Sequence, residues 1–194
     1  MSQNNKPKIS FTYNAPVTLT FALMSLIVLG VGYLTLGKST ALLFEGYRSK
    51  ISFFWFIRLF GHVLGHSSLT HYTSNMMLFL LLGPILEEKY GGKTLIEAFC
   101  IVAVISGLVN IIFFPGVALL GASGLVFMMI ILASSSDLKR GEIPITLILI
   151  ILIYLGSEVW SMITTHDNIS QLTHIIGGIC GAIIGLLINE KTSR

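Results

Sequence analysis

The sequence predicts an all-α membrane protein, a bundle of six transmembrane helices with a short fourth helix at its centre. Composition is the first reason, because 54% of the 194 residues are hydrophobic, only 11% are charged, and the mean hydropathy is +0.85. A water-soluble domain carries roughly 25% charged residues. Most of the surface must therefore face lipid. The other two reasons are the number of apolar segments and the length of the fourth.

Six apolar segments reach, or nearly reach, the ~20 residues (roughly 17–25) that a membrane-spanning helix needs. They are 17–36, 69–86, 95–117, 123–136, 143–163 and 172–188. A chain of this length is expected to form one compact bundle. We therefore expect a single membrane domain over residues 17–190, with short tails at 1–16 and 191–194.

Segment 17–36 follows a basic start, as a signal peptide would, but it is longer than the ~7–15-residue apolar core of a cleaved signal. We expect it to remain as the first span.

The fourth segment with its glycine-rich start, 121–136, would be about 24 Å long at 1.5 Å per residue, against hydrocarbon about 30 Å thick. A helix this short is expected to be surrounded by protein, with one end at a wet cavity.

The long connection 37–68 mixes basic residues with the apolar and aromatic stretch 51–60. Aromatic rings and basic groups are both favoured at the membrane interface, so this connection is predicted to lie there. Basic residues also predict the orientation, since cytoplasmic loops are enriched in them. With both termini in the cytoplasm, 8 of the 12 basic residues lie in the tails and inner loops: Lys6, Lys8, Lys89, Lys93, Lys139, Arg140, Lys191 and Arg194.

Polar side chains inside apolar spans are costly and usually have a function. Spans two, four and six run in the same direction, so their starts share the outer leaflet, and span three ends there. The polar residues that this topology predicts at similar depth are His62, His66, His71, Asn75, Asn110, Ser123 and His174. A transporter or channel would instead need polar residues along a complete path.

Ser123 has the surroundings that a serine nucleophile needs. Gly121 and Gly124 flank it and leave room for a peptide backbone, and His174 can act as its base near neutral pH. From Gly177 onward, glycines recur every fourth residue on the last span, which lets two helices touch backbone to backbone. We expect this contact to bring His174 to Ser123.

His71 and Asn75 are four residues apart on one face of the second span. Both side chains can donate a hydrogen bond, as stabilisation of an oxyanion requires. Each of these residues taken alone is weak evidence for catalysis, because a single serine or histidine in a membrane helix is usually a packing residue. We expect such a structural role for Ser106, Ser134 and Ser135. Catalysis is favoured because the candidate residues are predicted to lie together at one membrane depth.

No metal, cofactor or nucleic acid is expected. His62 and His66 have the i, i+4 spacing of a zinc pair, but the glutamate of the H-E-x-x-H metalloprotease motif is missing. No run of Lys or Arg resembles a nucleic-acid-binding patch. The lipid bilayer and other membrane proteins are therefore the expected partners, and the sequence indicates no oligomeric state.

Four motifs occur in the order and spacing of a known family. They are H-V-L-G-H-S-S-L-T-H-Y-T-S-N at 62–75, G-P-I-L-E-E-K-Y-G at 83–91, G-A-S-G at 121–124 and H-I-I-G-G-I-C-G at 174–181. They are similar to the H-x-x-x-H-x-x-x-x-H-x-x-x-N, G-x-x-x-E-x-x-x-G, G-x-S-G and H-x-x-G-x-x-x-G motifs of bacterial rhomboid proteases. The chain resembles that family over roughly residues 51–190.

The resemblance implies a rhomboid-like bundle in the bacterial inner membrane, with a water-filled cavity open to the outer face. It implies that Ser123 is the nucleophile, that His174 is the base, and that the Ser123 backbone N–H, His71 and Asn75 form the oxyanion hole. The residues expected to support this site are His66, Gly121, Gly124, Phe127 and Gly177. The implied substrates are single-span membrane proteins, cut near the outer face.

Three positions depart from the family pattern, and one of them is Thr173, where alanine is common before the base. Phe127 stands where many members have a tyrosine that stacks on the base; its ring can still pack but cannot donate a hydrogen bond. Ile57 precedes Arg58 where a tryptophan is common. The alternative to a protease is a catalytically inert rhomboid-like protein that binds and escorts membrane helices. Inert relatives typically lose the serine or the histidine, and this chain has both.

Overall fold

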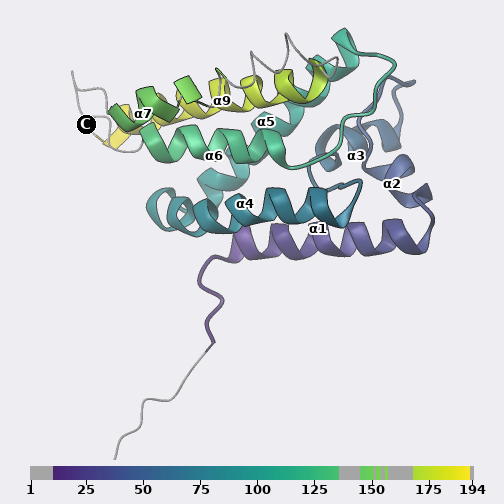
Figure 1. Cartoon of the computed structure of the whole chain (residues 1–194), viewed down its shortest axis with the longest axis horizontal. Coiled ribbons are helices and arrows are strands. Elements are labelled where there is room, and N and C mark those ends of the chain that lie inside the picture. Colours follow the sequence, from purple (N-terminus) through teal and green to yellow (C-terminus); the bar gives the residue numbers. More distant parts are fainter. Residues whose placement is uncertain (1–10, 136–144, 151, 154–155, 157–167, 193–194) are drawn as a thin grey trace, which may run out of the picture.

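A computed structural model describes residues 11–135, 145–150, 152–153, 156 and 168–192 (Figure 1). Within these residues the regular elements are helices, apart from one isolated bridge between Gly46 and Leu119. The predicted all-α fold is therefore confirmed for the described part of the chain. The helices are α1 (Pro16–Leu34), α2 (Lys38–Leu43), α3 (Phe53–Gly61), α4 (Leu69–Tyr90), α5 (Gly92–Phe113), α6 (Ser123–Ser135), α7 (Ile145–Ile150) and α9 (Asn168–Thr192).

Three described helices, α1, α4 and α5, are long and apolar enough to cross a membrane. Two further apolar stretches, Ser123–Ser134 in α6 and Leu172–Leu187 in α9, are shorter. Most of the segment 143–163, which we predicted as the fifth span, lies outside the described residues. The number of spans therefore stays a prediction.

The connection 37–68 is more ordered than the sequence suggested, because it contains α2 and α3. Ser52 caps α3 by accepting a hydrogen bond from Trp55 N (3.2 Å). Arg58 of α3 is buried and donates hydrogen bonds to Ser49 Oγ (2.6 Å) and Leu42 O (3.3 Å), with its guanidinium over the Tyr47 ring. One buried cation thus ties three parts of the connection together, a contact that a composition of aromatic and basic residues does not reveal.

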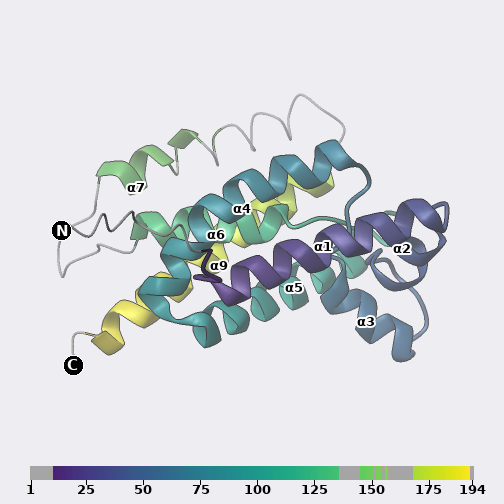
Figure 2. The same ribbon diagram turned by 90° about the horizontal axis from the view of Figure 1, so that it is seen from below.

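Helix α6 forms the centre of the bundle and lies between α9 and α4 (Figure 1). Its large side chains are shielded from solvent: Leu125, Met128, Met129 and Leu132 are each at most 1% exposed. This burial agrees with the expectation that a helix too short to cross lipid is surrounded by protein. The first turns of α4, α6 and α9 lie at the same end of the bundle, close to α2 and α3 (Figures 1 and 2).

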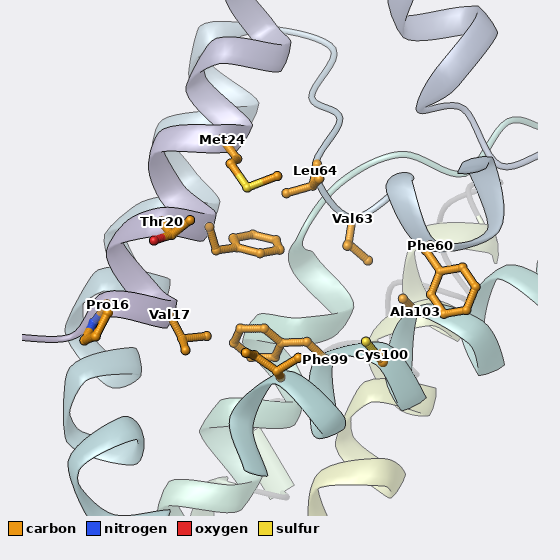
Figure 3. A pocket seen from close by; sticks show the side chains of 12 residues that line it. Pro16, Val17, Thr20, Met24, Phe60, Val63, Leu64, Phe99, Cys100 and Ala103 are labelled. Atoms are coloured by element: carbon orange, nitrogen blue, oxygen red, sulfur yellow. The ribbon is translucent and has the colours of Figure 1, made fainter. Parts of the chain in front are cut away.

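An apolar cavity of about 420 Å³ lies between α1, α5 and the segment that follows α3 (Figure 3). Met24 of α1, Val63 of that segment and Cys100 of α5 contribute to its lining. Its walls are almost entirely carbon, and none of the polar residues singled out in the sequence lines it.

Glu87 anchors α4 to the beginning of α1. Helix α1 starts with Pro16 and has no side-chain cap of its own, so its first N–H groups need outside acceptors. The buried Glu87 carboxylate accepts hydrogen bonds from Val17 N (2.8 Å), Thr18 N (2.9 Å) and Thr18 Oγ1 (2.8 Å). Its negative charge also suits the positive end of the helix dipole. The glutamate of the second motif therefore has a structural role.

We expect Glu87→Ala to lower the stability of the protein, because it leaves buried N–H groups without acceptors. A hydrogen bond to a charged group contributes about 1.5–3 kcal/mol, so a loss of at least about 2 kcal/mol in the free energy of unfolding is expected. The measurement is thermal unfolding in detergent, with the exposed neighbour Glu88→Ala as the control. Equal melting temperatures for the two variants would contradict the anchoring role.

Candidate active site

His71 and Asn75 of α4 converge on Gly121, two residues before Ser123. Ser68 caps α4 by accepting a hydrogen bond from His71 N (3.1 Å), which places both side chains on the first turns. A methyl group at Gly121 would lie 2.7 Å from His71 Nε2 and 3.7 Å from Asn75 Nδ2. Gly121 also has φ +125°, which residues with a side chain rarely adopt. Only glycine allows the backbone before Ser123 to approach these two donors.

The amide of Asn75 is available to a ligand at this point. Asn75 is 7% exposed, and its Nδ2 has no hydrogen-bond partner among the described residues. A buried donor without an acceptor costs free energy, so each such group in a native structure calls for an explanation. A substrate oxygen beside Gly121 would supply the missing acceptor.

Helices α6 and α9 meet backbone to backbone at glycines. The Cα of Gly177 lies against the carbonyl of Gly124, and the Cα of Gly181 lies against the carbonyl of Met128, so closely that a Cβ would overlap the oxygen in each case. Thr173 packs on Gly124 in the same contact. Because Ser123 precedes Gly124 and His174 follows Thr173, the two residues lie on neighbouring turns of packed helices.

Phe127 covers one face of the His174 ring. The two rings are stacked, with centroids 4.2 Å apart and planes inclined by 7°. Phe127 is one turn after Ser123 on α6, so the same helix carries the serine and the ring that orients the histidine. Ser123 and His174 are both half-buried.

His66 and Ser67 surround the remaining edges of the His71 ring. The His66 and His71 rings meet edge to face with centroids 5.0 Å apart. Ser67 Oγ lies 3.1 Å from His71 Nδ1, and Ser67 N donates to the same nitrogen at 3.5 Å. The sequence does not single out Ser67, since an exposed serine before a helix cap carries no periodic signal.

A cavity of about 380 Å³ with a mixed polar and apolar lining opens beside these two residues. Leu120 lines it from the segment before α6, and Tyr33, Thr40 and Glu45 line it from α1, α2 and the following loop. Ser67, which bonds to His71 Nδ1, is therefore at the wall of a cavity.

Two residues that the sequence grouped with the site have structural contacts instead. The ring of His62 is 1% exposed and its Nε2 donates to Ala103 O (3.0 Å) on α5. Asn110 donates from Nδ2 to Gly46 O (2.9 Å) and Val117 O (3.0 Å), which holds the two loop segments of the isolated bridge. The sequence grouped these two residues with the site by their positions along the predicted spans, and such positions do not give the direction of a side chain.

His66 and His62 are directed to different partners. His66 packs on His71 and donates from Nδ1 to Leu64 O (3.2 Å), while His62 is directed to α5. Within the described ranges, no group of three or more His, Cys, Asp or Glu side chains could hold a metal ion.

Two serines expected to be structural, Ser106 and Ser134, donate to carbonyls of their own helices, Val102 O (2.6 Å) and Ile130 O (2.8 Å).

Comparison with protein families identifies the class. A model of the rhomboid domain matches residues 54–191, which is more than half of the chain. The chain therefore belongs to the rhomboid family, a group of integral membrane proteins that are generally serine proteases and also include inactive members. No individual curated protein matches the sequence.

His62 gives the fold a dependence on pH. Burial lowers the pKa of His62 from its usual 6.5 to about 4. Between these two pH values, His62 is protonated in the unfolded chain but neutral in the folded protein. The free energy of unfolding therefore decreases as the pH falls from about 6.5 to about 4. We expect His62 to lower the free energy of unfolding by about 3 kcal/mol at pH 4 relative to pH 7, as measured by thermal unfolding.

The control is His62→Gln, whose amide can still donate to Ala103 O but does not titrate in this range. The free energy of unfolding of the variant should change less than that of the wild type between pH 7 and pH 4. If wild type and His62→Gln lost stability in parallel, another group would have to be responsible.

Proposed function

We propose that this protein is an intramembrane serine endopeptidase that uses a Ser123–His174 dyad. Ser123 is the nucleophile and His174 the general base, and an oxyanion hole is formed by the Ser123 backbone N–H, His71 and Asn75. The observation that carries the proposal is the convergence of His71 Nε2 and Asn75 Nδ2 on Gly121, directly before the serine. Two hydrogen-bond donors from another helix have no structural reason to meet at that point.

The proposed reaction is hydrolysis of a peptide bond. Ser123 Oγ attacks the scissile carbonyl carbon while His174 takes the hydroxyl proton, and the negative charge on the carbonyl oxygen is held by the three donors. The C–N bond then breaks as His174 protonates the leaving amine. Water, deprotonated by His174, hydrolyses the acyl-enzyme and releases the second product.

Orientation of the base does not need an acid in this scheme. In a Ser-His-Asp triad the aspartate holds the imidazole in place. Here the Phe127 ring, stacked on His174 at 4.2 Å, restricts the rotation of the imidazole, and the glycine packing of α9 on α6 fixes its height above Ser123. A phenyl ring suffices for stacking, so the absent tyrosine hydroxyl removes no reacting group.

The substrates proposed are single-span membrane proteins, cut near the outer face of a bacterial inner membrane. This proposal includes six spans with both termini in the cytoplasm, as the distribution of basic residues favours. The site then lies at the outer end of the bundle, beside α2 and α3. Water can reach that level, and a substrate helix that unwinds there exposes its peptide bonds.

We expect Ser123→Ala and His174→Ala each to abolish cleavage of a single-span test substrate by the purified protein, with losses of at least about 10⁴-fold. The losses should not add in the double variant, because nucleophile and base act as one unit. Ser134→Ala, which removes only a hydroxyl bonded to its own helix, is the matched control. Robust cleavage by Ser123→Ala would rule out the dyad. An intact wild-type protein that binds the substrate but never cuts it would favour an inert escort.

The oxyanion donors should contribute less than the dyad. We expect Asn75→Ala to lower kcat by about 10²-fold, since single donors in such sites are worth about 10²–10³-fold and two others remain. Thr73→Ala is the control, because Thr73 is exposed on the same helix and its hydroxyl donates to Thr70 O. The measurement is kcat and KM for both variants. A change confined to KM would assign Asn75 to substrate binding and contradict its role as an oxyanion donor.

A further inference from the structure

The neutral His71 ring can donate at its substrate-facing edge only in one of its two tautomers. A neutral imidazole carries one N–H donor and one bare acceptor nitrogen. Nε2 faces Gly121, so an oxyanion donor requires the proton on Nε2 and a bare Nδ1. Something on the Nδ1 side must therefore favour the bare nitrogen.

Ser67 is the residue on that side. Its backbone N–H, which can only donate, points to His71 Nδ1 at 3.5 Å, and its hydroxyl lies 3.1 Å from the same atom. A protonated Nδ1 would face the Ser67 N–H and lose that bond. With Nδ1 bare, the amide and the hydroxyl can both donate to it.

The exposure of this contact makes a fixed donor necessary. The hydrogen bonds between Ser67 and His71 are exposed, so water has access to the Nδ1 edge of His71. Water accepts and donates equally well, and it would leave both tautomers populated. His66 does not compete for the proton, because its own Nδ1 donates to Leu64 O (3.2 Å) and only its ring edge meets His71.

We propose that Ser67 is a positioning residue that holds His71 in the Nε2–H tautomer, with the donor aimed at the oxyanion. The inference rests on the proposed function and adds a residue to its site. Ser67 does not touch the substrate in this scheme and acts only through the imidazole of His71. The adjacent Ser68 has a different task, since its hydroxyl caps α4 by accepting from His71 N (3.1 Å).

The two neighbouring serines provide a matched pair of variants. Ser67→Ala removes the hydroxyl that bonds to the ring, whereas Ser68→Ala removes the helix cap and leaves the ring contacts in place. We expect Ser67→Ala to lower kcat by about three- to tenfold, the value of one hydrogen bond, with little change in KM or in melting temperature. Ser67→Thr, which keeps the hydroxyl, should restore kcat. Ser68→Ala should lower the melting temperature instead.

The direct readout is ¹⁵N NMR of the full-length protein in micelles with labelled histidine, with the His71 signals assigned from a His71→Gln sample. In wild type and in Ser68→Ala, neutral His71 should be almost entirely the Nε2–H tautomer. Ser67→Ala keeps the long backbone N–H contact (3.5 Å) and loses the closer hydroxyl donor (3.1 Å), so the fraction of the Nδ1–H form should rise measurably. An unchanged tautomer ratio in Ser67→Ala would overturn the proposal.

The tautomer ratio is measured without substrate and does not depend on cleavage. If Ser123→Ala still cut the substrate, the proposed function would fail while the contact between Ser67 and His71 could still be confirmed. If the dyad behaved as expected but the tautomer ratio did not respond to Ser67→Ala, only the positioning role would fail.

Discussion

The contact between Gly124 of α6 and Gly177 of α9 is the constraint on which the site depends. A helix carrying any side chain at Gly177 could not lie this close, because the Cβ would overlap the Gly124 carbonyl. The contact sits one residue after Ser123 and three residues after His174, so it sets the separation of the proposed nucleophile and base. Gly181 repeats it one turn further on, against Met128, and prevents the two helices from pivoting.

Helix α4 supplies the other half of the site and is held at both ends. Near its last turn, Glu87 binds the start of α1 through three hydrogen bonds, and Gly83 lets Thr18 of α1 pack on the helix backbone. On its first turns, His71 and Asn75 meet Gly121. Because α4 is one continuous helix between these points, the anchor near its last turn helps to determine where the His71 and Asn75 side chains lie on its first turns.

The sequence predicted this arrangement where periodicity or backbone sterics carry the information. Glycines at every fourth residue predicted the approach of α9 to α6, and Ser123 and Leu69 begin helices where the apolar segments were expected to start. Prediction failed where the direction of one side chain decides. His62 and Asn110 lie at the expected end of the bundle but bond to Ala103 and to the loop backbone. Ser67 was missed because its contact with His71 depends on a turn outside any regular element.

Covalent labelling of the unmodified protein tests most directly whether the glycine contact produces an activated serine. The measurement is reaction with a fluorophosphonate, followed by mass spectrometry of the peptides to locate the adduct. The account predicts an adduct on Ser123 in the wild type and in Gly116→Ala, a glycine with open space around it, and little or none in Gly177→Leu or His174→Ala. Labelling of Ser123 at the wild-type rate in His174→Ala, or an adduct on a different serine, would contradict it.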